Sequence, residues 1–315
     1  MESVIRSLEI PGGIKQKTWF ELEEIELTPE LQRFYDGSFY WPKATKDKPG
    51  IIGNFVTTRE GFVSFNIPGK LHAGFISESN PGDRFIMGLT RTLASVDQDG
   101  VKGAIMNGAN TLNVEKDVIM TAADIYPDAE QQYREYLEKK VGQQFKQAPL
   151  IFVTGSGRLE FDAEVFKESA EIETFVLTTS DGVREVKERT KDLKKGYVPP
   201  QVIVVGQGRA VNLPKAMEIL RKEYGFTRLL TEGGARFFNN LHKDSLIQLD
   251  LQSIAPMIAG NDRSKGKDDR VSMADGYQFS PEEAPRFDLF SSKTDGRFLY
   301  LQYARQLKNV SDQAR

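Results

Sequence analysis

Three short glycine-containing turns each follow an apolar run, and such turns suit the binding of an anionic ligand. They are Asn107-Gly108, the residues Thr154–Arg158, and Glu232-Gly233-Gly234. Two adjacent glycines permit a positive φ angle and let backbone N–H groups approach a ligand closely. A helix that starts after such a turn adds unpaired N–H donors and the positive end of its dipole. These turns therefore predict a phosphate-binding site, whereas the acidic Glu232 is expected to contact a polar, non-phosphate part of a substrate.

The segments that would carry these turns alternate between strand-like and helix-like patterns. Apolar runs predict strands near residues 50–58, 101–106, 149–154, 173–179, 201–205 and 227–231. Helical spacing follows Asn80, Asn212 and Gly234. This order is typical of an α/β fold, with a largely parallel central sheet and helices on both faces. Because ligands bind beyond the carboxyl ends of such strands, we expect the three turns to meet at one site.

Other segments have less definite patterns. Residues 62–65 are expected to continue the first strand after a turn, residues 247–252 to form a half-buried strand near a sheet edge, and residues 298–303 to form a final strand. Residues 124–146 are polar and helical in character, which predicts a surface excursion. Arg84 and Arg91 share one helix face, which is either a basic ridge for a phosphate or a solvated surface.

The composition argues against several classes of function. The 315 residues carry a formal net charge of -3, which does not favour nucleic-acid binding. Cysteine is absent, and His72 and His242 are far apart in sequence, so no metal centre is predicted. No apolar run reaches the roughly 18 residues of a membrane span, and the N-terminus lacks the order of a signal peptide. We therefore expect a cytoplasmic protein with no membrane partner.

The first 48 residues differ from the rest of the chain because aromatic side chains cluster there among acidic ones. Such a large aromatic area must be covered. We therefore predict an aromatic N-terminal extension over residues 1–48, packed on a main domain of residues 49–315 or across a subunit interface. Within it, Thr28 and Pro29 are typical of a helix start.

One long segment resembles a known family. The run LLTEGGARFFNNLHKDSLIQLDLQSIAPMIAG, at residues 229–260, is similar to the reductase domain of bacterial riboflavin-biosynthesis deaminase-reductases, a branch of the dihydrofolate-reductase-like fold. The upstream runs AIMNGANTL and LIFVTGSGRLEFDAEVF resemble two further segments of that family. The resemblance implies a homodimeric reductase that uses NADPH to reduce the ribose of a ribosylaminopyrimidine phosphate to a ribityl chain.

The resemblance also implies roles for individual residues. Gly233, Gly234, Ala235 and Arg236 would hold the cofactor's pyrophosphate, and Thr111, Glu115 and Phe75 match further cofactor contacts. Glu232 and Arg91 would bind the substrate. The remaining cofactor candidates come from the other two turns: Asn107, Gly108, Thr154, Gly155, Ser156 and Arg158. Arg158 is assigned to the 2′-phosphate because a guanidinium can bind it through two hydrogen bonds. The proton that completes the reduction would come from Glu232 or from water.

Two departures from the family pattern leave other functions open. The family's Asp-Gly-Lys turn is replaced by Glu60-Gly61-Phe62, and its acidic-proline segment by residues 118–123. The missing lysine favours a non-catalytic nucleotide-binding or regulatory protein of the same fold. A third possibility is a structural protein that uses the aromatic extension as an interface, with the glycine turns serving only as strand-to-helix connections.

Overall fold

Side-chain caps fix the starts of several helices in this computed structural model, which describes residues 5–8, 20–67, 71–261 and 270–306. The side chains of Thr28, Asn80 and Asn212 each accept a backbone N–H of the first turn, and each is followed by a proline near the first helical position. The described α-helices are α1 (Pro29–Tyr35), α2 (Gly74–Ser77), α3 (Pro81–Leu93), α4 (Ala109–Val114), α5 (Ala122–Ile125), α6 (Glu130–Glu135), α7 (Gly182–Thr190), α8 (Leu213–Lys222) and α9 (Ala235–Lys243).

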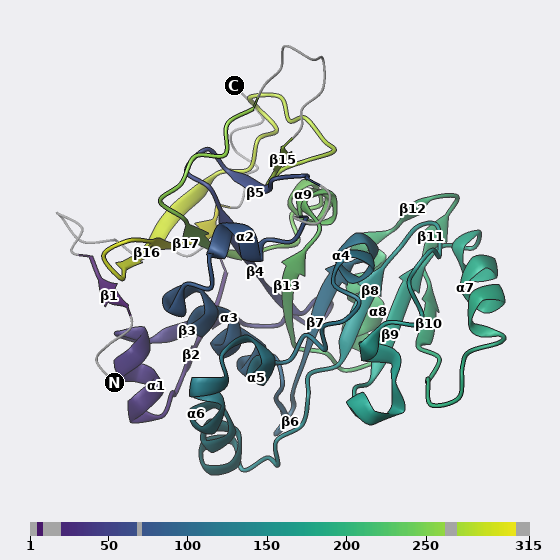
Figure 1. Ribbon diagram of the computed structural model, residues 1–315, viewed down its shortest axis with the longest axis horizontal. Coiled ribbons are helices and arrows are strands. Elements are labelled where there is room, and N and C mark those ends of the chain that lie inside the picture. Colours follow the sequence, from purple (N-terminus) through teal and green to yellow (C-terminus); the bar gives the residue numbers. More distant parts are fainter. Residues whose placement is uncertain (1–4, 9–19, 68–70, 262–269, 307–315) are drawn as a thin grey trace.

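The strands form one large sheet with the order β1-β16-β17-β14-β4-β13-β7-β8-β9-β10, which Figure 1 shows across the molecule. These strands are β1 (Arg6–Ser7), β4 (Gly50–Thr57), β7 (Val101–Gly108), β8 (Leu150–Val153), β9 (Thr174–Thr178), β10 (Gln201–Val204), β13 (Arg228–Gly233), β14 (Leu249–Ile254), β16 (Phe287–Thr294) and β17 (Leu299–Arg305). Pairing is parallel from β14 through β10. It is antiparallel among β14, β17, β16 and β1. The predicted largely parallel sheet is therefore confirmed.

Smaller strands accompany the sheet. β6 (Asp97–Gln98) pairs with β7, and three two-stranded pairs lie apart from the main sheet. They are β2 (Leu22–Ile25) with β3 (Phe39–Pro42), β5 (Phe62–Ser64) with β15 (Val271–Ser272), and β11 (Gly206–Gln207) with β12 (Ala210–Val211). The expectation that residues 62–65 continue the first strand is therefore wrong, because β5 pairs with β15 instead.

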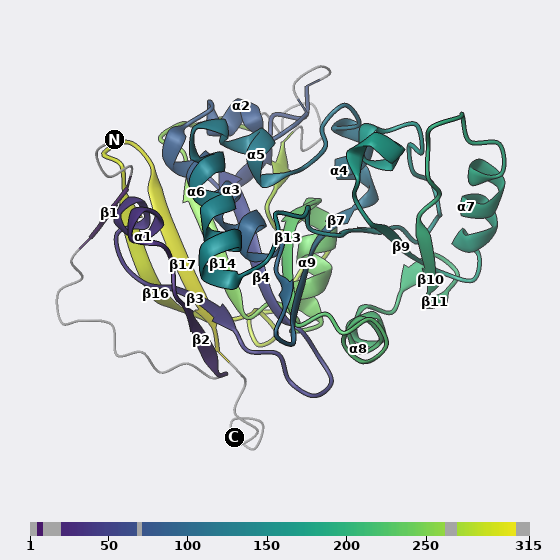
Figure 2. The same cartoon turned by 90° about the horizontal axis from the view of Figure 1, so that it is seen from below.

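Helices cover both faces of the sheet, as predicted, and each face has its own hydrophobic core. Figure 2 shows α3, α5 and α6 on one side of β4 and β13, with α8 and α9 on the other. Phe85 and Leu89 of α3 belong to the first core, whereas Leu220 of α8 and Phe238 of α9 belong to the second. The strands between the cores are buried on both faces, and all eight residues of β4 are buried.

The described part of the N-terminal segment packs on the first core. Trp41 is fully buried, and its Nε1 donates a hydrogen bond to the Gly50 carbonyl oxygen over 3.1 Å. The Arg228 guanidinium of β13 lies over the Trp41 ring and pairs with Glu23 of β2 at 3.0 Å. These contacts cover the predicted aromatic surface within this chain. The domain boundary at residues 48 and 49 stays a prediction.

Tertiary packing overturns further expectations. Residues 124–146 are more than a surface excursion, because Tyr133 and Leu137 are fully buried and the Tyr133 hydroxyl donates to the Phe85 carbonyl oxygen. β14 is an interior strand between β4 and β17 instead of lying near an edge. Its polar Asp250 is buried with the apolar residues. The alternation of polar and apolar residues therefore did not indicate a solvent-exposed face of this strand.

Candidate active site

The carboxyl ends of β13, β7 and β8 lie side by side, which brings the three glycine turns to one edge of the sheet (Figure 1). Gly233 of β13 is in register with Asn107 of β7, and Asn107 with Phe152 of β8. The convergence expected from the sequence is therefore present. It follows from the parallel order of neighbouring strands, each of which turns at the same edge.

The turn between β13 and α9 needs its two glycines for different reasons. Gly234 has φ 75°, a left-handed conformation that side chains other than glycine rarely adopt. Gly233 is packed so closely that an added Cβ would lie 2.4 Å from Thr111 Oγ1 and 2.7 Å from Asn107 Oδ1. No side chain caps the start of α9. The first N–H groups of α9 therefore receive no side-chain acceptor, as an anion site at a helix start requires.

Arg91 and Glu232, the two predicted substrate ligands, form a buried ion pair between α3 and the end of β13. Arg91 Nε donates to both Glu232 carboxylate oxygens over 2.9 Å, and its Nη2 lies 2.8 Å from Oε2. The two side chains are 4% and 3% exposed. Arg91 Nη1 also donates to the Thr121 carbonyl oxygen. The Arg91 side chain therefore lies neither on a solvated surface nor on an open basic ridge for a phosphate. Arg84, on the same helix, donates to the Ile125 carbonyl oxygen and to Ser79 Oγ.

Glu115 lies where α4 ends, within electrostatic reach of that ion pair. Burial raises the pKa of its carboxyl, Arg91 and His72 oppose this shift electrostatically, and Glu232 adds to it. His72 itself stacks on Phe75, with ring centroids 4.5 Å apart. The site thus combines one carboxylate held in a buried ion pair with a second, half-buried carboxyl whose pKa is raised.

The other predicted cofactor residues differ in how accessible they are. Thr154 Oγ1 accepts the Gly157 backbone N–H, and Ser156 Oγ accepts that of Arg158, so the turn after β8 is held by its own hydroxyls. The Arg158 side chain is 72% exposed and lies 3.9 Å from Glu185. The Arg236 side chain is 81% exposed and forms a 2.7 Å ion pair with Asp275. The sequence patterns did not predict Asp275 as a partner, because it lies on a loop 39 residues further along the chain.

The residues of the site fit the phosphates of a dinucleotide. α9 begins without a side-chain cap, after a left-handed glycine. Asn107 Oδ1 is buried beside this turn and has no hydrogen-bond partner in the described structure. The exposed Arg158 guanidinium is available at the turn after β8. Together these features offer donors to an anion and an acceptor to a polar ligand group.

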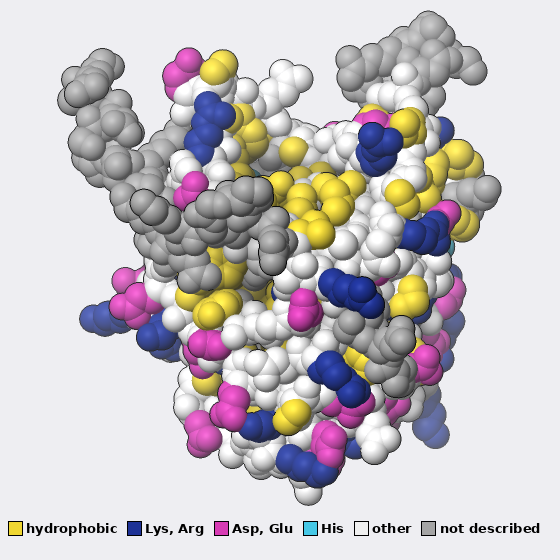
Figure 3. Space-filling view, turned by 90° about the vertical axis from the view of Figure 1, so that its left-hand side faces the viewer, with side chains coloured by type: hydrophobic (Ala, Val, Ile, Leu, Met, Phe, Trp, Pro, Cys, Tyr) yellow, Lys and Arg dark blue, Asp and Glu magenta, His cyan; other side chains and the backbone are white. Residues whose placement is uncertain are grey.

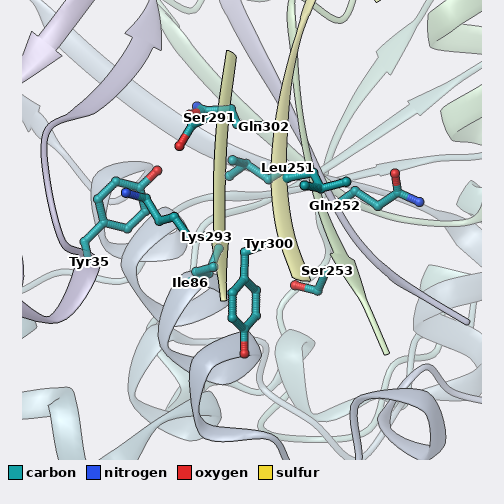
Figure 4. Close-up of a pocket in the computed structure, with 10 residues that line it drawn as sticks. Tyr35, Ile86, Leu251, Gln252, Ser253, Ser291, Lys293, Tyr300 and Gln302 are labelled. Atoms are coloured by element: carbon teal, nitrogen blue, oxygen red, sulfur yellow. The ribbon is translucent and has the colours of Figure 1, made fainter. Parts of the chain in front are cut away.

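Two hollows in the described structure lie away from this site. One, of about 10 Å³, is enclosed by Tyr35, Lys293, Tyr300 and neighbours on β14, β16 and β17 (Figure 4). It has room for about one water molecule. The other, of about 230 Å³, is lined by residues such as Phe161, Arg189 and Tyr197. Neither is lined by a predicted site residue.

Within the described ranges, no group of three or more His, Cys, Asp or Glu side chains could hold a metal ion. No helix in this part of the chain has the length and apolar character needed to cross a membrane.

Comparisons with known proteins agree with the fold. Acinetobacter baumannii RibD (form 1) aligns with TM-score 0.57 and 13% identity, over 83% of this chain and 59% of that one. Saccharomyces cerevisiae riboflavin biosynthesis reductase Rib7 aligns with TM-score 0.53 and 14% identity, over 83% and 91% of the two chains. A pyrimidine reductase-like protein from Corynebacterium diphtheriae gives 0.56 and 15%, over 83% and 94%. This chain thus spans less than two thirds of the Acinetobacter protein.

Sequence comparison assigns the family. No curated protein matches the chain. The family model described as the RibD C-terminal domain matches residues 80–297, which is more than half of the chain. The α/β fold with its strand-end turns is therefore the dihydrofolate-reductase-like fold that the sequence predicted. The protein belongs to the RibD C-terminal domain family.

Proposed function

We propose that this protein is an oxidoreductase that uses NADPH to reduce the ribose of a ribosylaminopyrimidine phosphate to a ribityl chain. The observation that carries the proposal is the convergence of the β13–α9 turn, the Arg91–Glu232 pair and Glu115 at one edge of the sheet. Membership of the RibD C-terminal domain family supports it. A non-catalytic role is less favoured, because a raised carboxyl pKa beside a buried ion pair is typical of catalytic sites.

The cofactor would lie across the three turns. The backbone N–H groups of Gly234, Ala235 and Arg236 would hold its pyrophosphate at the start of α9. Asn107, Gly108 and Thr111 would contact its nicotinamide half, together with Phe75. The turn after β8 would hold the adenosine half through Thr154, Gly155 and Ser156, with Arg158 at the 2′-phosphate. When bound, the reduced nicotinamide would supply a hydride.

The chain must supply the proton. Reduction of the ribose adds a hydride to C1′, breaks the bond between C1′ and the ring oxygen, and requires a proton on that oxygen. Both Glu232 oxygens accept a hydrogen bond from Arg91, which holds the carboxylate in place. Their remaining lone pairs are suited to accept hydrogen bonds from substrate hydroxyls. Glu115 keeps its proton to higher pH than an ordinary glutamate, because its pKa is raised. We therefore assign proton transfer to Glu115 and substrate orientation to Glu232 and Arg91.

A binding titration followed by turnover tests this function. The purified protein is titrated with NADPH and with NADH, and reduced-nicotinamide fluorescence is recorded. We expect NADPH to bind more tightly, and its absorbance to fall when the ribosylaminopyrimidine phosphate is added. Binding without turnover of this substrate would support the non-catalytic alternative. Absence of binding by either dinucleotide would overturn the proposal.

The proposal includes a cytoplasmic homodimer. Figure 3 looks onto the end of the sheet that carries β1 and β16, and hydrophobic side chains gather on its upper half. Leu299 and Leu301 alternate with the buried Tyr300 and Gln302 along β17, and Leu299 is 40% exposed. An exposed apolar sheet face is suited to contact a second copy. Light scattering of the eluted protein should give twice the mass of the chain, and a single-chain mass would contradict the dimer.

A further inference from the structure

The β11–β12 hairpin packs directly on the turn after β8. Its tip is Gly208-Arg209, and Gly208 has a positive φ of 60°. A Cβ added to Gly155 would lie 1.9 Å from the Arg209 carbonyl oxygen and 3.2 Å from the Arg209 Cα. Gly155 therefore allows the hairpin backbone to approach, and Arg209 is brought beside the turn that carries Arg158.

A single buried hydroxyl joins the two segments. Thr179 Oγ1 contacts the Gly155 carbonyl oxygen over 2.9 Å and the Gly208 carbonyl oxygen over 2.6 Å. The same oxygen accepts the Gly182 backbone N–H at the start of α7. Thr179 is fully buried. The hairpin tip is therefore held in a fixed position relative to the turn instead of being a loose loop.

Positive charge at this position is not neutralised. Arg209 is exposed, and no ion pair or side-chain hydrogen bond involves it in the described part of the chain. Arg158 reaches Glu185 only at 3.9 Å, and Glu185 also pairs with Arg189 at 3.1 Å. The other nearby acid, Asp181, pairs with Arg184. Two guanidinium groups on adjoining, anchored segments therefore lack a close anionic partner of their own.

We propose that Arg209 and Arg158 together bind the 2′-phosphate of NADPH and so set the preference for NADPH over NADH. This inference rests on the proposed function. Guanidinium groups bind phosphate oxygens through paired, charge-assisted hydrogen bonds. Dinucleotide sites that take NAD instead place an acidic residue at the ribose. Here the acids next to the turn are occupied by other arginines, which leaves the position suited to a phosphomonoester.

Binding measurements on two variants and a control test the proposal. Arg209→Gln and Arg158→Gln remove one charge each from exposed side chains, so the fold is expected to persist. Arg297→Gln removes a charge whose side chain is 67% exposed, from the segment between β16 and β17 at the other end of the sheet, and serves as the control. Calorimetry with NADPH, NADH and adenosine 2′,5′-bisphosphate should show that Arg209→Gln weakens both 2′-phosphorylated ligands about tenfold or more. Binding of NADH should be unchanged in every variant.

The outcomes separate this inference from the proposed function. If the wild-type protein binds NADPH and Arg209→Gln binds it equally well, the role of Arg209 is wrong and the reductase proposal stands. Equal loss of NADPH and NADH affinity in Arg209→Gln would also overturn the assignment of Arg209 to the 2′-phosphate, because the arginine would then bind a part that both dinucleotides share. If the wild-type protein binds neither dinucleotide, the proposed function and this inference fail together.

Discussion

Arg91 and Glu232 show how one buried pair can serve both stability and chemistry. Their side chains are almost fully buried, so each charge depends on the other for solvation. Removal of one partner leaves an uncompensated charge between α3 and β13. The pair is also the group that would orient a substrate, so its loss should affect both folding and catalysis.

The stability part of this role can be measured alone. We expect Glu232→Gln to lower the free energy of unfolding by about 3 kcal/mol. Glu130→Gln is the matched control, because Glu130 pairs with Arg134 on the surface with both side chains more than 40% exposed. That change should cost about 0.5 kcal/mol or less. Urea denaturation measures both, and equal losses would contradict the importance of burial.

Glu115 makes a separate, pH-dependent prediction. Its pKa is raised by burial, and its protonated form is the one assigned to catalysis. The turnover number should therefore be highest below this raised pKa and should fall as pH rises through it. Glu115→Gln should lose most turnover, and Glu115→Asp should retain the pH dependence. An unchanged pH profile in Glu115→Gln would exclude Glu115 as the proton donor.

At the scale of elements, a buried polar network ties the end of α9 to the sheet. His242 of α9 lies 3.3 Å from Asp250 of β14, and Arg305 of β17 contacts the other ring nitrogen of His242. Burial raises the pKa of Asp250 to about 8, against the opposing charge of Arg305. Burial and Arg305 lower the pKa of His242 to about 3. The folded His242–Asp250 pair therefore binds one proton, on Asp250, between about pH 3 and about pH 8.

This network predicts a stability change at mildly alkaline pH. Between the ordinary values of 3.8 and 6.5, the unfolded pair also binds one proton, because Asp250 has lost its proton and His242 has gained one. From pH 6.5 to about 8 only the folded pair keeps it, so the free energy of unfolding should fall as pH rises, by about 1.4 kcal/mol per pH unit. Denaturation at several pH values should show that the free energy of unfolding falls less steeply with pH in Asp250→Asn than in the wild-type protein. Identical slopes in the two proteins would contradict the shared proton.

At the scale of the whole molecule, the N-terminal segment and the main domain share one hydrophobic core. Trp41, Phe39 and Phe34 belong to the same cluster as Phe85 of α3. Phe34 and Phe85 have ring centroids 5.7 Å apart. A shared core of this kind couples the two parts, so they should unfold together.

A tryptophan variant tests this coupling. Trp41→Ala should lower the free energy of unfolding of the whole molecule by about 3 to 5 kcal/mol, because it leaves a cavity in the core. In a Trp19→Phe background, Trp41 fluorescence and far-ultraviolet circular dichroism should give one coincident transition. An earlier fluorescence transition would show instead that the N-terminal segment unfolds independently.

Local sequence determined much of this protein. The caps at Thr28, Asn80 and Asn212 and the left-handed Gly234 depend on neighbours within a few residues, so patterns alone predicted them. The strand-turn-helix order likewise predicted a parallel sheet and the meeting of the three turns. The family resemblance then supplied the candidate residues at the Glu232–Gly234 turn, and the roles of all the turn residues stay predictions.

Tertiary structure decided what depends on residues far apart in the chain. The Arg91–Glu232 pair joins positions 141 residues apart, and nothing in either local pattern indicates that it closes into a buried contact. The interior place of β14 depends on its pairing with β17, which comes about 50 residues later. Arg209 reaches the Thr154–Arg158 turn only because parallel strands bring successive loops to one edge of the sheet. Spacing in the sequence fixes which local elements form, whereas burial and charge pairing depend on which distant elements pack together.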